Sequence, residues 1–95
     1  MDFVKVRWLS SALRELDRVY EYVARDNPKA AKSVFRRIRS TATRLGKFPE
    51  SGRRGQVQGT RELVVNDLPY IIVYRISPAG IEVIRVLHTA MDRSA

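Results

Sequence analysis

Short hydrophobic runs that alternate with polar positions fill the second half of the chain. They are rich in Val, Ile and Tyr, and two turn sequences containing Pro, Gly, Asn or Asp separate them. Runs of this kind between turn residues are typical of consecutive antiparallel strands. A further alternation near the N-terminus predicts one more strand, which must join the same sheet to satisfy its backbone hydrogen bonds. The expected strands cover residues 2–8, 61–65, 70–76 and 81–88.

Two stretches between the first strand and the others repeat hydrophobic residues every three or four positions, which predicts two amphipathic helices. Ser10 or Ser11 could cap the first helix, whereas Asn27 followed by Pro28 suits the start of the second and Gly46 suits its end. The apolar stripe of the first helix consists of Leu13, Leu16, Tyr20 and Val23. The stripe of the second consists of Ala31, Val34, Phe35, Ile38, Ala42 and Leu45.

The predicted order of elements is β-α-α-β-β-β, within a single domain that covers residues 1–95. This order indicates the α+β class, with a sheet packed against a helical hairpin. Both apolar stripes cover one face of the sheet, and the other face is expected to be open or only partly covered by loops. Residues 47–60, which include Pro49, three glycines and Arg53–Arg54, are expected to form a loop.

Composition narrows the possible functions. The chain has no cysteine and one histidine, which excludes disulfides, thiol catalysis and the common zinc sites. It has no apolar run of the roughly 18 residues that span a bilayer. Lys5 and Arg7 interrupt any signal-peptide core, so we expect a cytoplasmic protein without a membrane contact, metal or cofactor.

The charge of the chain is strongly positive and unevenly distributed. Eighteen Lys and Arg residues stand against ten acids, for a net charge of +8. Ten of the basic residues lie between Arg25 and Arg54, together with only two acids, Asp26 and Glu50. Such a segment is either a solvated helix face or a surface for an anionic partner, and that partner could be nucleic acid or an acidic protein.

The predicted strands carry three arginines and the histidine that could form an active site. Arg61, Arg75 and Arg85 could share one exposed sheet face and hold phosphates or carboxylates, if the strand registers allow it. Alternatively, each arginine pairs with a local acid, for which Glu62, Asp67 and Glu82 are the candidates. His88 is a candidate acid or base only if another group orients it, and it could equally be a structural residue at a strand end.

Five short sequences occur in an order and at spacings that are specific as a set. They are Asp26-Asn27-Pro28-Lys29-Ala30-Ala31, Phe48-Pro49 with Gly52-Arg53, Arg61-Glu62-Leu63-Val64-Val65, Pro69-Tyr70-Ile71-Ile72-Val73-Tyr74-Arg75, and Val86-Leu87-His88. Together they resemble the RelE/ParE superfamily of bacterial toxins over essentially the whole chain. The resemblance implies a twisted antiparallel sheet against a helical hairpin, and a toxin that an antitoxin neutralises by direct binding.

The superfamily has two mechanistic branches, and two positions favour one of them. RelE-like members cleave mRNA on the ribosome, and they typically carry an arginine where this chain has Ile71 and a basic residue where it has Thr89. An isoleucine cannot stabilise the charge of a phosphorane, a contribution of about 3–4 kcal/mol per donor in comparable sites. The tail also lacks the tyrosine of the RelE-like set. The resemblance is therefore closer to ParE-like toxins, which inhibit DNA gyrase by binding and need no catalytic residue.

We accordingly predict a ParE-like toxin with gyrase as its target. The alternative is a ribosome-dependent mRNA endonuclease that uses Arg61, Arg75, Arg85 and His88. A third hypothesis, a plain nucleic-acid-binding domain, rests on the charge alone. The residues predicted to bind the target are Arg85, His88, Met91 and Arg93.

The expected antitoxin is a ParD-like protein with an acidic, amphipathic C-terminal segment. It would lay a helix in an apolar groove and could add a strand at a sheet edge. The predicted contacts combine apolar helix residues with a rim of arginines. They are Leu13, Leu16, Tyr20, Val34 and Ile38, with Arg36, Arg37 and Arg44.

Overall fold

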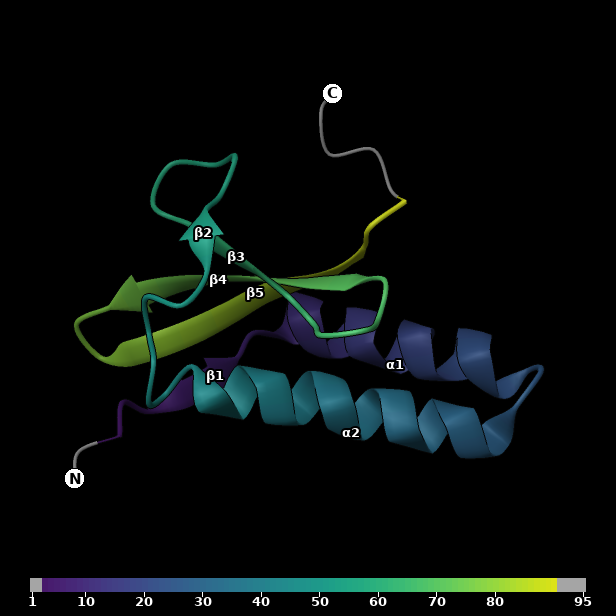
Figure 1. Cartoon of the computed structure of the whole chain (residues 1–95). Coiled ribbons are helices and arrows are strands. Elements are labelled where there is room, and N and C mark those ends of the chain that lie inside the picture. The colour runs from purple at the N-terminus through teal and green to yellow at the C-terminus, as the bar shows by residue number, and fades with distance from the viewer. Residues whose placement is uncertain (1–2, 91–95) are drawn as a thin grey trace.

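The computed structural model describes residues 3–90 and arranges them in two layers, a twisted sheet and a pair of helices beneath it (Figure 1). This confirms the α+β fold expected from the sequence. The elements in chain order are β1 (Val6–Trp8), α1 (Ser10–Ala24), α2 (Pro28–Arg44), β2 (Arg53–Arg54), β3 (Arg61–Val64), β4 (Tyr70–Ser77) and β5 (Gly80–His88).

The sheet has the strand order β1-β5-β4-β3-β2. Strands β3, β4 and β5 form the antiparallel meander expected from their turns, but β1 pairs with β5 in parallel through Val6 and Ile81. The sheet also gains a strand within the segment expected to be a loop. Arg53–Arg54 pairs with the first two residues of β3, because the preceding chain is fixed against β4.

The helix boundaries follow the capping chemistry only in part. Asn27 caps α2 by accepting a hydrogen bond from the backbone N–H of Ala30, as its position before Pro28 predicts. The prediction for α1 is wrong, because Leu9 occupies the N-cap position and makes no side-chain cap. Ser11 instead lies inside the helix, and its hydroxyl donates to the carbonyl oxygen of Ile84 in β5.

The core lies between the helix pair and one face of the sheet. Leu16 and Ile38 face it from the two helices, and Ile72, Tyr74 and Val83 face it from the sheet. At roughly 1.5–3 kcal/mol for each large side chain removed from water, this cluster is the main stabilising contribution to the fold. The other face of β4 carries Ile71 and Val73, because neighbouring residues of a strand alternate between the two faces.

A β-bulge interrupts the pairing of β4 with β5. Tyr74 pairs with Val83 and Val73 pairs with Arg85, so Ile84 is an extra residue in β5. The bulge breaks the simple alternation along β5. Val83 therefore points into the core, whereas Arg85, two residues later, does not.

Candidate partner-binding groove

The structure separates the three arginines that the sequence could place on one sheet face. Arg61 pairs in register with Tyr74, which places it on the face that carries the helices. Its guanidinium donates to the carbonyl oxygen of Gly52 at 2.8 Å and to that of Glu50 at 3.4 Å. Arg61 thus holds the 50–52 segment in place and does not face Arg75 or Arg85.

The other two arginines are each held by a glutamate. Arg75 donates to Glu82 on the neighbouring strand at 2.5 Å, which confirms the local pairing suggested as an alternative. Arg7 contacts the same carboxylate, and the hydrogen bond from Arg75, more than that from Arg7, holds the pKa of Glu82 below its usual range. Arg85 binds Glu15 of α1 at 2.6 Å, a partner that lies 70 positions away in the sequence.

Glu15 also completes the hydrogen bonding of a strand edge. Past Val83, where β1 ends, no strand of residues 3–90 lies along the outer edge of β5, and the backbone N–H of Val86 donates to Glu15 at 2.9 Å. The side chain of Ser11 satisfies the Ile84 carbonyl on the same edge. The pair formed by Glu15 and Arg85 is therefore a structural link between α1 and β5.

His88 lies beside a tyrosine rather than beside the arginines. Its ring meets that of Tyr70 edge-on with 5.3 Å between the centroids, and its Nδ1 accepts from the backbone N–H of Ala90. Burial, and secondarily the phenol of Tyr22, raises the pKa of Tyr70, so this hydroxyl remains protonated. His88, Tyr70 and Tyr22 line an open pocket of about 400 Å³.

The residues predicted to bind the target are only partly placed. Arg85 and His88 lie at the end of β5, with the partners described above. Met91 and Arg93 lie outside the described residues. Within residues 3–90, no group of three or more His, Cys, Asp or Glu side chains is arranged to hold a metal ion.

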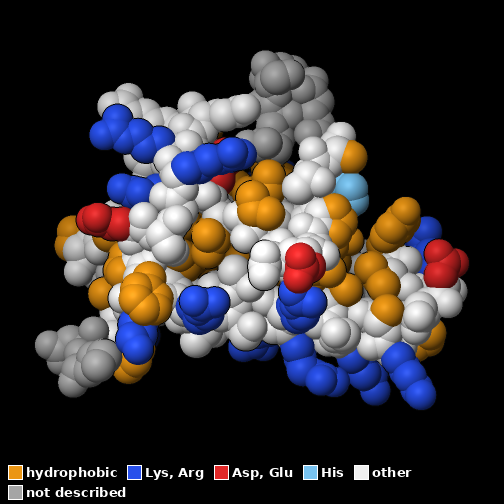
Figure 2. Space-filling model, in the orientation of Figure 1, with side chains coloured by type: hydrophobic (Ala, Val, Ile, Leu, Met, Phe, Trp, Pro, Cys, Tyr) orange, Lys and Arg blue, Asp and Glu red, His pale blue; other side chains and the backbone are white. Residues whose placement is uncertain are grey.

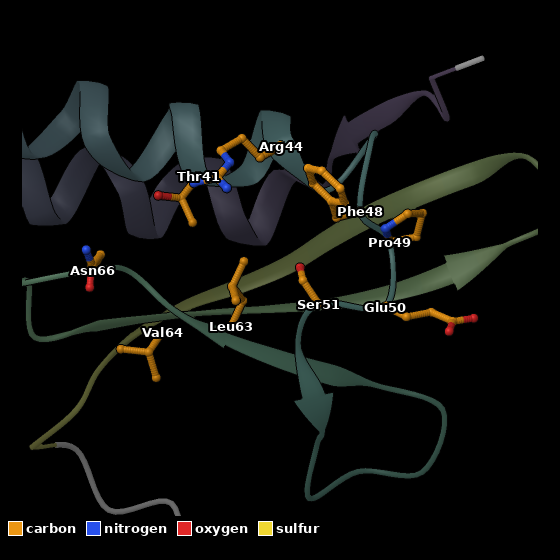
Figure 3. Close-up of a pocket in the computed structure, with 9 residues that line it drawn as sticks. All are labelled: Thr41, Arg44, Phe48, Pro49, Glu50, Ser51, Leu63, Val64 and Asn66. Atoms are coloured by element: carbon orange, nitrogen blue, oxygen red, sulfur yellow. The ribbon is translucent and has the colours of Figure 1, made fainter. Parts of the chain in front are cut away.

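An open groove of about 650 Å³ lies between the C-terminal half of α2 and β3. Figure 3 shows Thr41 and Arg44 reaching into it from α2, with Leu63 pointing toward the helix from β3. Phe48 and Pro49 close one end, and the carboxylate of Glu50 points away. The groove is lined by Thr41, Arg44, Phe48, Pro49, Glu50, Ser51, Leu63, Val64 and Asn66.

Residues 49–52, which follow α2 in the chain and form one wall of the groove, are held in place by the buried Tyr74. The hydroxyl of Tyr74 donates to the carbonyl oxygen of Pro49 at 2.7 Å and accepts from the backbone N–H of Gly52 at 2.9 Å. Together with Arg61, this side chain fastens residues 49–52 to the sheet. The groove is therefore preformed, although its wall belongs to a segment that looks like a free loop in the sequence.

One side of the groove is an open strand edge. Strand β2 pairs only with Arg61 and Glu62, so within the described residues no strand lies on the outer side of β3, opposite β4, from Leu63 onward. The apolar side chains along this edge are accessible, with Phe48 and Val64 each 50% exposed. An edge of this kind beside an apolar groove can accept a further strand or an amphipathic helix.

Two arginines lie at the rim of the apolar strip, Arg44 along it and Arg37 at its end, where Arg37 also pairs with Asp67 at 3.8 Å. Arg37 donates to the carbonyl oxygen of Asn66 at 2.5 Å, which brings its guanidinium to the turn that ends the groove. Figure 2 shows exposed hydrophobic side chains across the middle of this face, with Lys and Arg side chains above and below them. The rim is thus complementary to a segment that combines apolar and acidic residues.

Some of the helix residues predicted to contact the antitoxin are buried in the fold, and others are accessible. Leu16 and Ile38 belong to the closed core, with 2% and 0% of their surface exposed, so no partner reaches them in this structure. Leu13 is exposed, and Tyr20 and Val34 are half-buried. Of the predicted arginines, Arg44 lines the groove and Arg37 lies at its end, whereas Arg36 lies on the side of α2 that faces away from the core.

The sequence did not predict the apolar groove residues outside the helices, which are Phe48, Pro49, Leu63 and Val64. A signal for the first was present, since Phe48 is a large apolar residue within an otherwise polar segment. Nothing in the sequence indicates that Val64 borders an open edge, because that depends on how far β2 extends along β3.

No helix within residues 3–90 has the length and apolar character needed to cross a bilayer. The described residues form a small two-layer α+β fold with an open groove between α2 and β3, and Arg44 and Arg37 lie at the rim of that groove. Residues 6–93 match the family model described as the ParE toxin of the type II toxin–antitoxin system parDE.

Curated relatives agree with that match. The chain is 45% identical over 84 residues to the putative toxin Y4kP of Sinorhizobium fredii, covering 88% of this chain and 86% of the relative. It is 33% identical to the toxin RelE2 of Caulobacter vibrioides, covering 90% of this chain and 96% of the relative. It is also 33% identical to the toxin ParE3 of that organism, covering 85% and 82%.

A solved structure has the same fold. It is described as the chromosomal ParDE TA system from P. aeruginosa, with a TM-score of 0.83 at 21% identity, and the match covers 90% of this chain and 96% of the other. Taken with the family model, these similarities show that the chain belongs to the ParE toxin family of type II toxin–antitoxin systems.

Proposed function

We propose that this toxin inhibits DNA gyrase by binding it, and that an acidic, amphipathic segment of its antitoxin neutralises it by occupying the groove between α2 and β3. The observation that carries the proposal for the antitoxin is the combination of an apolar strip, an open strand edge and a cationic rim. The ParE family membership supports a proteinaceous partner of this kind.

The chemistry of the groove specifies the partner segment. Its apolar side chains would pack on Phe48 and Leu63, and its acids would face Arg44 and Arg37. Each well-buried apolar side chain contributes roughly 1.5–3 kcal/mol, so the apolar contacts supply most of the affinity. The acids mainly add specificity and accelerate association.

A pair of matched variants tests the groove. Phe48→Ser removes an exposed apolar side chain inside it, and Val57→Ser removes one that is 69% exposed outside it. We expect Phe48→Ser to weaken antitoxin binding at least tenfold, measured by titration calorimetry, and Val57→Ser to leave it unchanged. Equal affinities for the two variants would remove the groove from the proposal while leaving the gyrase target untested by this result.

The inhibitory mechanism is supported by the way the candidate catalytic residues are held. A nuclease of the RelE type needs free cations that converge on a phosphate, and Arg61, Arg75 and Arg85 have separate partners within the fold. The position of the missing arginine is taken by Ile71, which is buried. A toxin that acts by occupying a surface of its target requires no such convergence.

The endonuclease alternative has one observation in its favour. The open pocket that contains His88 also contains Tyr22, Tyr70 and Arg18, which are groups able to bind and polarise a phosphodiester. Translation-dependent cleavage of mRNA by the purified toxin, abolished in His88→Ala and in Arg61→Ala, would establish this function in place of gyrase inhibition.

A further inference from the structure

The outward side of α2 carries a row of cations that the groove does not use. Ala31, Ile38 and Ala42 face the core, so helical spacing places Lys29, Lys32 and Arg36 on the opposite side. All three are exposed. We call these three residues the outer row.

No acid interrupts this region of the chain. Residues 28–47 contain seven Lys and Arg residues and no Asp or Glu. The hydroxyl residues Ser33, Ser40 and Thr43 lie on the same side of the helix as the outer row and are also exposed. This side of α2 therefore suits an anionic ligand that presents several negative charges at regular spacing.

The outward side of α1 shows what a merely solvated helix face looks like in the same protein. Arg14, Arg18 and Arg25 lie along one side, but Asp17 and Glu21 stand between them. The two helices lie side by side and have similar lengths (Figure 1). The absence of acids is therefore specific to α2 and is not a property of helices in this chain.

The outer row remains accessible when the groove is filled. Arg37 and Arg44 turn toward the β3 side, where the antitoxin segment is proposed to bind. Figure 2 shows Lys and Arg side chains projecting from the margin of the molecule below the band of hydrophobic side chains. The two sets of cations thus serve different surfaces of one helix.

We propose that the outer row binds the phosphate backbone of double-helical DNA. From Lys29 to Arg36 the outer row extends about 10 Å along the helix axis, which corresponds to about three base-pair steps of DNA, and the hydroxyl residues continue the same side of the helix to Thr43. Lysines, arginines and hydroxyl groups are the side chains that proteins use for phosphate contacts without base recognition.

The composition of the row also argues for a duplex rather than a single strand. Single-stranded nucleic acid is bound by exposed aromatic rings on which bases stack. The aromatic residue of α2, Phe35, is half-buried, lies edge-on to Tyr20 and has the guanidinium of Arg39 over its ring. The choice of DNA over duplex RNA rests on the proposed gyrase target, because gyrase acts on duplex DNA.

Fluorescence anisotropy with a labelled duplex of about 30 base pairs tests this proposal, because the salt dependence of binding counts the phosphates neutralised. The test variant is Lys29→Gln, Lys32→Gln and Arg36→Gln combined. The control combines Lys5→Gln, Arg14→Gln and Arg25→Gln, which removes the same charge from exposed positions outside the outer row. We expect the slope of log K against log salt to lose about 2.7 in the test variant and to change little in the control.

Equal slopes for the two variants would overturn the proposal, and so would equal competition by duplex RNA or polyglutamate. A supercoiling assay on the same variants separates this inference from the proposed function. If DNA binding does not depend on the outer row while wild-type toxin still inhibits gyrase, only the row is refuted. If DNA binding depends on the row and gyrase is unaffected by wild-type toxin, the gyrase target is refuted.

Discussion

Replacing Tyr74 by phenylalanine removes one oxygen atom that joins the sheet to the wall of the groove. The ring stays in the core, but the backbone N–H of Gly52 loses its acceptor and the carbonyl of Pro49 loses its donor. A buried polar group without a partner costs about 1–3 kcal/mol. The Gly52 group is buried and carries that cost in full, whereas Pro49 is half-buried and its carbonyl can reach water.

We therefore expect Tyr74→Phe to lower the free energy of unfolding by about 2 kcal/mol, which is about 10 °C in Tm for a chain of this size. Urea denaturation followed by the fluorescence of Trp8 measures it. Tyr70→Phe is the matched control, because it removes the same atom from the same face of β4, where the described residues give the hydroxyl no hydrogen bond. If the Tyr74→Phe protein were as stable as the control, the two hydrogen bonds of the Tyr74 hydroxyl would not stabilise the fold.

Antitoxin affinity provides a second readout of the same change. If residues 49–52 form a wall that is fixed before the partner arrives, loosening them adds an ordering cost to binding. We expect Tyr74→Phe to weaken antitoxin binding and Tyr70→Phe to leave it unchanged. Unaltered affinity in a destabilised Tyr74→Phe protein would show that the wall does not contribute to the groove.

Three further predictions concern the sheet. The pKa of Glu82 is lowered in the folded protein, so its stabilising effect is present above the ordinary glutamate pKa and is lost as the pH falls through the lower folded pKa. Glu82→Gln should therefore flatten the acid limb of a plot of the free energy of unfolding against pH. An unchanged acid limb would contradict this. Gly80→Ala places a Cβ 2.4 Å from the backbone oxygen of Lys5, whereas the Cβ of Gly59→Ala meets nothing within 4 Å. Gly80→Ala should therefore lower the free energy of unfolding several times as much as Gly59→Ala. Equal losses would exclude the collision. Glu15→Ala should lower hydrogen-exchange protection at the Val86 amide about tenfold, and full protection would mean that the β5 edge is satisfied otherwise.

The order of the helices and the antiparallel meander could be predicted because they rest on local rules. Asn27 and Pro28 define the start of α2 through capping chemistry, and the turns at 66–69 and 77–80 separate strands of clear alternation. The parallel pairing of β1 with β5 is not local, since it joins residues 75 positions apart. To predict this pairing, one must know where the helical hairpin places the later strands relative to β1.

The candidate site was harder to predict because it depends on distant partners. Alternation along β5 suggests that Arg85 faces the same way as Val83, but the bulge at Ile84 reverses that relation. The partner of Arg85 is Glu15, which no pairing rule in the sequence indicates. The wall of the groove likewise depends on Tyr74, whose hydroxyl spans 25 positions to reach Pro49.

Inhibition of gyrase supercoiling by the purified toxin is the most direct test of a binding mechanism. Relaxed plasmid is incubated with gyrase, ATP and increasing toxin, with and without an equimolar amount of the antitoxin. We expect supercoiling to be lost as toxin increases and to return when antitoxin is present. Full supercoiling at a large excess of toxin, together with translation-dependent cleavage of mRNA by the same preparation, would contradict it.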